Sequence, residues 1–171
     1  PIDKEMAKLV YEICDSKKLI GITLMSDSVD PNVITASPEV LLQEVKNQLL
    51  LNPKNAVQMA INLTKMNKIH WGSAVEIFRQ SQHINELTAY CMDCLPDSAE
   101  ASTWQTLVLE TNLKMNPTLA ETIFQTKKFS HFNKTRLGPL CEQKGLYHRA
   151  LENFTDLKDI KRVLVNNSAH I

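Results

Sequence analysis

Two cysteines three positions apart, Cys91 and Cys94, have the spacing of a metal-binding or redox pair. A structural zinc site needs four ligands, however, and no second pair of suitable side chains follows at a matching interval. On a helix the two thiols share a face with the apolar side chains of Leu87, Tyr90 and Leu95. The pattern therefore predicts that both cysteines pack in a core and bind no metal.

Cys141 and His148 are the residue types that act together as nucleophile and general base. They flank Gly145, a predicted helix end with positive φ, and the sequence shows neither a third residue to orient the base nor a group of oxyanion donors. We therefore predict no catalytic residues, and the chain is not expected to be an enzyme.

The histidines and glycines have no spacing typical of a metal or cofactor site. No two histidines lie four positions apart, as on a metal-binding helix, and the four glycines stand alone rather than in a phosphate-binding loop. No cofactor is predicted. Surface or capping roles are predicted for the five histidines, which are His70, His83, His131, His148 and His170.

A local basic bias in the last third of the chain is the remaining candidate site. Lys158, Lys161 and Arg162 lie within five positions of one another. Such a group is either a solvated helix face or a weak contact surface for a partner, and the sequence leaves both interpretations open.

The composition is that of an ordered globular chain without a strong overall charge. Apolar residues make up 43% of the 171 positions, and 19 basic residues balance 19 acidic ones. This balance argues against binding to nucleic acid or directly to an anionic membrane. No apolar run approaches the length of a membrane span, and the few cysteines lie in helical patterns, so a reducing, cytoplasmic location is predicted.

Helical periodicity dominates the sequence and predicts an all-α chain. A helix is expected from about Pro38 to Leu51, and Asn52-Pro53 then caps and begins a second helix. The segment from Leu19 to Ala36 is expected to hold a turn or longer loop. Further helices are predicted around Ala74–Phe78, Leu87–Leu95, Trp104–Leu113, Ala120–Phe124, Leu137–Cys141 and Leu146–Phe154, with a last one beginning near Asp156 or Asp159.

Internal repetition narrows the prediction to one architecture. The pattern Leu49 to Met59 returns as Leu113 to Ile123, so that Pro53 and Pro117 lie 64 positions apart, or about two helical hairpins of ~34 residues each. An α-α superhelix explains this return, whereas a compact bundle does not. We predict about five antiparallel hairpins in a right-handed stack. The motif Ala-x-x-x-Phe occurs three times and predicts equivalent buried rings at Phe78, Phe124 and Phe154.

The segment Leu140–Arg162, LCEQKGLYHRALENFTDLKDIKR, resembles the leg repeat of the clathrin heavy chain. The strong similarity covers roughly the last sixty residues and is weaker from Pro38 to Ser98. The resemblance implies either a clathrin heavy chain or a divergent relative with the same repeat. It also implies one helical-repeat segment, 1–171, of a larger chain, with a less certain hairpin and loop at 1–36 and the clathrin-type repeat at 37–171.

The resemblance further implies a structural role, as a rod-like piece of the ankle-to-distal leg in a lattice that serves vesicle formation, endocytosis and intracellular protein transport. The implied partners are other clathrin-like legs, with light chain or accessory and adaptor proteins elsewhere on the full chain. Membrane association would be indirect, through adaptors, on the cytoplasmic face of coated pits and vesicles. The alternative is a free-standing helical-repeat adaptor that docks partner peptides or helices in a groove.

Overall fold

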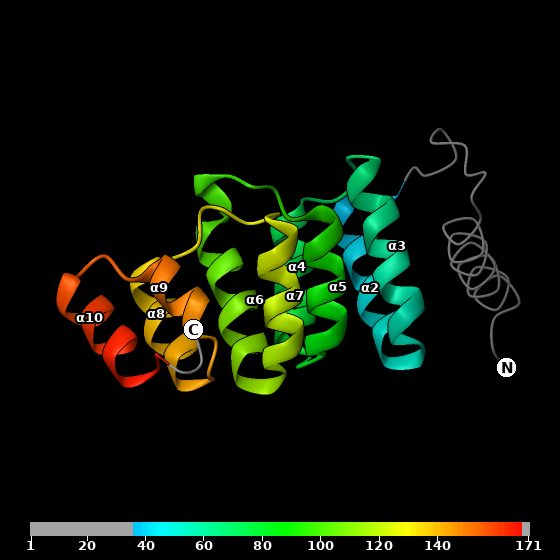
Figure 1. The fold of residues 1–171 in the computed structure, drawn as a ribbon. Helices are drawn as coiled ribbons and strands as arrows, with labels where there is room; N and C mark the ends of the chain where they lie inside the picture. The colour runs from blue at the N-terminus through cyan, green and yellow to red at the C-terminus, as the bar shows by residue number, and fades with distance from the viewer. Residues whose placement is uncertain (1–35, 169–171) are drawn as a thin grey trace, which may run out of the picture. The chain divides into compact units, whose positions relative to one another are not determined.

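A computed structural model describes residues 36–168. All the regular secondary structure in that range is helical, which confirms the all-α prediction (Figure 1). The chain forms two compact units that divide between Cys94 and Leu95. The predicted loop between Leu19 and Ala36 lies almost entirely outside the described residues.

The first unit contains two helical hairpins. Its helices are α2 (Pro38–Leu51), α3 (Pro53–Lys65), α4 (Trp71–Gln80) and α5 (Ile84–Cys94). α2 packs on α3 and α4, and α5 packs on both α3 and α4, so the second hairpin stacks on the first. The largest buried side chains of this core include Leu41, Met59, Phe78, Leu87 and Tyr90.

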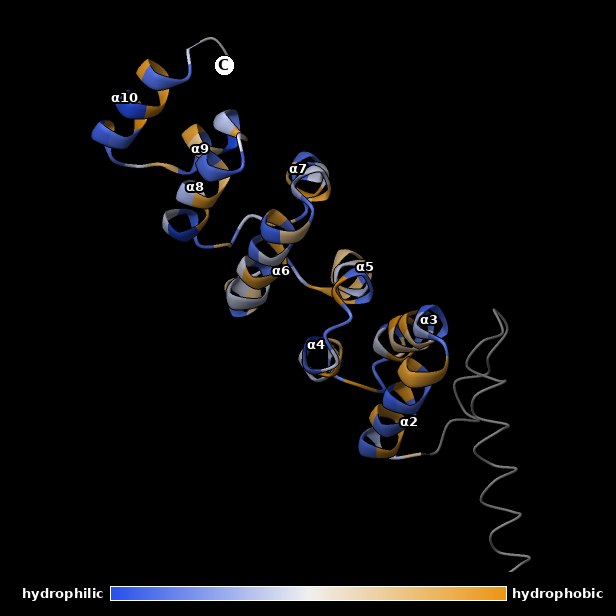
Figure 2. Ribbon diagram, turned by 90° about the horizontal axis from the view of Figure 1, so that it is seen from below, coloured by the Kyte–Doolittle hydropathy of each residue, from blue (hydrophilic) through white to orange (hydrophobic). Residues whose placement is uncertain are grey.

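The second unit repeats this order and adds one helix. After the short 3-10 helix η2 (Ala99–Ala101) come α6 (Ser102–Met115), α7 (Pro117–Thr126), α8 (Lys134–Gln143), α9 (Tyr147–Asn153) and α10 (Leu157–Asn166). α6 packs on α7 and α8, α8 packs on α9, and α9 packs on α10. Hydrophobic and hydrophilic residues share the same helices in both units, as expected for helices that bury one face (Figure 2).

The predicted repeat is present at the level of hydrogen bonds. Asn52 and Asn116 each accept a bond from the backbone amide three residues later, at 3.2 Å in both cases. Each also donates its own amide to the last turn of the preceding helix, at 2.7 Å. The alanines that follow, Ala56 and Ala120, are both fully buried. The same cap therefore begins the second helix of a hairpin in each unit, which supports the predicted solenoid class of stacked hairpins.

The prediction of three equivalent buried rings is wrong. Phe78 is fully buried, but Phe124 and Phe154 are only half-buried. The reason is that Phe78 lies on the first helix of its hairpin, whereas the other two rings belong to second helices, and Phe154 is already the C-cap of α9. An arginine side chain covers each of these two rings.

Four hairpins followed by α10 lie within residues 36–168, so the predicted total of about five and the right-handed stack stay predictions for the whole chain. In the same range, none of the helices combines the length and hydropathy required to cross a bilayer.

Candidate assembly surface

The candidate basic residues lie on α10, whose N-terminus is fixed by Asp156. The carboxylate of Asp156 accepts a hydrogen bond from the backbone amide of Lys158 at 2.8 Å. This confirms the predicted start of the last helix. Val163 is fully buried and anchors the inner face of α10.

The outer face of α10 carries both cationic and apolar side chains. Lys158 and Lys161 are exposed. Leu157, Leu164 and Val165 expose 71%, 44% and 77% of their surface on the same helix. These five residues are termed the α10 surface below. A partner can bury these apolar side chains while its acidic groups contact the lysines. Such a contact is weak and sensitive to salt.

Arg162 has a different role, because its guanidinium is engaged within the chain. It donates to Glu142 of α8 at 2.7 Å and also bonds Asp159 one turn earlier. It lies 5.7 Å from the centre of the Phe154 ring. Glu142 and Asp159 raise the pKa of Arg162 above its ordinary value. The structure thus separates Arg162, which links α10 to the preceding hairpin, from Lys158 and Lys161, which face solvent.

Arg149 repeats this arrangement one helix earlier, on α9. Its guanidinium donates to both carboxylate oxygens of Glu121 on α7, to Glu152, and lies 5.7 Å from the centre of the Phe124 ring. The side chain is only 18% exposed. The hydrogen bond from Arg149 is the main reason that the pKa of Glu121 lies below its ordinary value. A shielded ion pair of this kind fixes the register between α7 and α9.

A third pair joins α6 to α8. Glu110 is nearly buried and accepts from Lys114 and from Arg136, both at 2.6 Å. In all three cases an arginine therefore bonds a glutamate two helices earlier in the chain. Sequence reasoning missed these pairs, and opposite charges 20 to 28 positions apart, less than a whole hairpin of ~34 residues, are the signal that could have revealed them.

The connection between α7 and α8, residues 127–133, is held by side chains from the start of the second unit. Asp97 accepts from the backbone amide of Ser130 at 2.8 Å and from its hydroxyl at 2.7 Å. Gln105 accepts from the amide of His131 at 2.9 Å and itself donates to Asp97 at 3.0 Å. Thr106 accepts from the amide of Asn133 at 2.8 Å. Side chains thus bond three of the four amides from Ser130 to Asn133, in place of the backbone bonds that a helix would supply.

The thiols are positioned for packing rather than reaction. Cys91 is fully buried as predicted, but Cys94 is half-buried because it ends α5, and Leu95 takes the next core position. Burial raises the pKa of Cys141 to about 12, which suppresses the nucleophilic thiolate. His148, which has the residue type of a general base, is exposed. The structure does not bring the two together as a reactive pair.

Three of the histidines are exposed or cap helices, in line with the prediction. His70 is the N-cap of α4 and accepts from the amide of Gly72 at 3.1 Å. His131 and His148 are exposed, His83 is half-buried, and His170 lies outside the described residues. Among residues 36–168 no three His, Cys, Asp or Glu side chains are grouped so that they could hold a metal ion.

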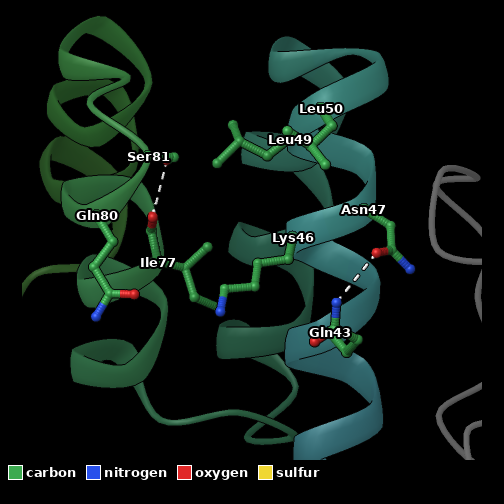
Figure 3. A pocket seen from close by; sticks show the side chains of 8 residues that line it. All are labelled: Gln43, Lys46, Asn47, Leu49, Leu50, Ile77, Gln80 and Ser81. Atoms are coloured by element: carbon green, nitrogen blue, oxygen red, sulfur yellow. Dashed lines mark hydrogen bonds between the residues drawn. The ribbon is translucent and has the colours of Figure 1, made fainter.

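A hollow between α2 and α4 in the first unit is a candidate for the groove that the adaptor hypothesis requires (Figure 3). Leu49 and Ile77 form its apolar part, and Lys46 extends across it toward Ile77. Its volume is about 260 Å³. This is below the range of roughly 300–1,000 Å³ that is typical of small-ligand sites and far short of a groove for a helix.

Comparison with known proteins places these observations in one family. A family model described as the region in clathrin and VPS matches residues 63–170. Clathrin heavy chain 2 of Oryza sativa is 39% identical over 133 residues, 75% of this chain and 8% of the rice protein. The clathrin heavy chain of Dictyostelium discoideum is 35% identical over 177 aligned positions, 96% of this chain and 10% of its own length.

The similarity extends further toward the N-terminus than the sequence analysis expected. A probable clathrin heavy chain of Schizosaccharomyces pombe is 35% identical over 98% of this chain, and the match covers 10% of that protein. The chain thus spans about a tenth of the length of the relatives it matches. No solved structure gave a significant match.

Proposed function

The chain belongs to the clathrin heavy-chain repeat family, and from that premise we propose that it forms a stretch of a rod-like leg in a coat lattice. Coat lattices of this kind would serve vesicle formation, endocytosis and intracellular protein transport. The observation that carries the proposal is the match of residues 63–170 to the family, in a chain that forms one hairpin with an Asn-Pro cap in each unit. The segment supplies length and stiffness rather than chemistry.

Stacked hairpins are suited to this mechanical role. Within each unit the two hairpins pack on one another, and the three Glu–Arg pairs resist sliding between neighbouring helices of the second unit. Side-by-side legs in a lattice can then share many small polar contacts. Each contact is weak and reversible, while their number stabilises the assembly.

The proposed partners are other legs of the same kind, with the α10 surface as the candidate contact of this segment. Light chains and adaptors are proposed to bind elsewhere on the full protein, and the membrane is reached through them. The corresponding location is the cytoplasmic face of coated pits and vesicles. The adaptor alternative is not favoured, because the relatives are coat proteins and the groove between α2 and α4 is small.

The proposal is tested on the full-length gene product. We expect it to be several times longer than 171 residues, and to sediment as closed lattices at low ionic strength that dissociate when salt is raised. Electron microscopy of the pellet distinguishes lattices from aggregates. A short product that stays monomeric and instead captures a helical peptide would overturn the coat proposal in favour of the adaptor.

A further inference from the structure

Ser130 occupies an unusual position in the connection 127–133. It is exposed, lies outside the helices, and its hydroxyl donates directly to the carboxylate of Asp97 at 2.7 Å. Its backbone amide bonds the other oxygen of the same carboxylate. Ser130 is therefore held by one carboxylate, which accepts hydrogen bonds from both its amide and its hydroxyl.

The residues before Ser130 give it the charge pattern of a kinase substrate. Lys127 and Lys128 lie three and two positions earlier, and Lys127 is exposed with a left-handed backbone, φ 53°, that ends α7. Protein kinases select substrates largely by such charge patterns around an accessible serine on a segment that can be extended. We propose that Ser130 is a phosphorylation site, and that its modification releases the connection between α7 and α8.

The reaction is an ordinary phosphoryl transfer from ATP. The Ser130 hydroxyl oxygen bonds to the γ-phosphorus as the bond from that phosphorus to the β,γ-bridging oxygen breaks. ADP leaves, and the hydroxyl proton passes to the base of the kinase. The product carries a charge of about −1.5 to −2 and no longer has a hydroxyl proton to donate.

Phosphorylation reverses the interaction with Asp97 from attraction to repulsion. Asp97 has a pKa below its ordinary value because Ser130 and its amide bond the carboxylate, so Asp97 is charged at neutral pH. A phosphate beside this carboxylate loses the hydroxyl bond and places like charges in contact. The neighbouring hydrogen bond, from the amide of His131 to Gln105, weakens as well, because Gln105 itself donates a hydrogen bond to Asp97. Phe129, which is 6% exposed, lies next to Ser130 and becomes accessible as the connection opens.

The test uses the 171-residue chain, the catalytic subunit of cyclic-AMP-dependent kinase and magnesium ATP, with mass spectrometry to locate phosphate. We expect phosphate at Ser130, and at least about tenfold less of it in the matched variant Lys127→Gln/Lys128→Gln. Hydrogen exchange then compares the modified and unmodified chains. The amides of Ser130 and His131 should exchange about tenfold faster after modification, as expected when a charge-assisted hydrogen bond is lost.

The Asp97→Asn variant separates charge repulsion from a simple steric effect. Asparagine keeps the shape of the side chain and can donate to phosphate, so phosphorylation of this variant should not accelerate exchange. Absence of phosphate at Ser130 while other serines or threonines are modified would overturn the site. Unchanged exchange at Ser130 and His131 in the phosphorylated chain, or equal acceleration in the Asp97→Asn chain, would overturn the release mechanism.

Discussion

The guanidinium of Arg149 on α9 bonds both carboxylate oxygens of Glu121 on α7, with N···O distances of 2.8 to 3.2 Å across 28 positions of sequence. Arg162 bonds Glu142 in the same manner across 20 positions, and each arginine lies over a phenylalanine ring. The two sites differ mainly in the exposure of the arginine, which is 18% for Arg149 and 46% for Arg162, whereas Glu121 and Glu142 are similarly exposed at 28% and 24%. They form a natural matched pair for experiment.

Arg149→Met should destabilise the chain by about 2 kcal/mol, because it removes a guanidinium that is only 18% exposed and leaves Glu121 without its partner. Arg162→Met removes the same contacts at an exposed site, where water screens the charges, and should have a clearly smaller effect. Urea unfolding followed by circular dichroism measures both. Equal losses of stability would show that shielding of the ion pair does not govern its strength.

The same pairs predict how stability depends on pH. Hydrogen bonds from Lys114 and Arg149 lower the pKa values of Glu110 and Glu121 below 4.5 in the folded chain. The unfolded chain therefore binds these protons first, so the stabilisation is fully present above pH 4.5 and is lost as pH falls through the lower folded values. The free energy of unfolding should fall less steeply with acidification in Glu121→Gln than in the unmodified chain. Parallel slopes below pH 4.5 would contradict the assignment for Glu121.

How far the sequence predicts this structure depends on the range of the interaction. The Asn-Pro caps and the positive φ of Gly145 are local, and both are found where the sequence places them. The burial of Phe124 and Phe154 was predicted wrongly, because it depends on which helix of a hairpin carries the ring. The Asp97–Ser130 contact joins residues 33 positions apart in two irregular segments. No periodic pattern marks such a pair.

The repeated caps predict equal effects at two distant positions. Asn52→Ala and Asn116→Ala should each cost about 1 kcal/mol, since both remove one cap bond of the same length from the same kind of helix start. Asn→Asp at either position keeps the acceptor and serves as the control. Thermal unfolding of the four variants measures the effects. A difference of more than about twofold between the two alanine variants would mean that the repeat is not energetically regular.

The buried thiols should be protected from modification in the folded chain. At pH 8, in a Cys14→Ser background, an aromatic disulfide reagent should label the half-buried Cys94 well before Cys91 or Cys141. A pKa near 12 in place of 9 lowers the thiolate fraction of Cys141 on the order of a thousandfold. Peptide mapping by mass spectrometry identifies the order of labelling, and addition of urea should abolish the difference. Early labelling of Cys141 without urea would refute its protected position.

The last prediction concerns the α10 surface and follows from the different roles of its neighbours. Lys158→Glu/Lys161→Glu reverses two exposed charges without touching the bonds of Arg162 to Glu142 and Asp159, so the helix content and unfolding midpoint should change little. Arg162→Glu, in contrast, places a third carboxylate beside two existing ones and should increase hydrogen exchange throughout α10.

In the full-length protein the Lys158→Glu/Lys161→Glu variant should require a lower salt concentration for lattice sedimentation, because each lost contact is small but recurs in every leg. Reversed charge also makes a further prediction: mixing the variant with unmodified chain should restore part of the assembly if the lysines face acidic residues of a neighbouring leg. If lattices of the Lys158→Glu/Lys161→Glu variant form at the same salt concentration as those of the unmodified protein, the α10 surface takes no part in leg-to-leg contact. The unchanged helix content of the variant would show that this result concerns the surface and not the fold.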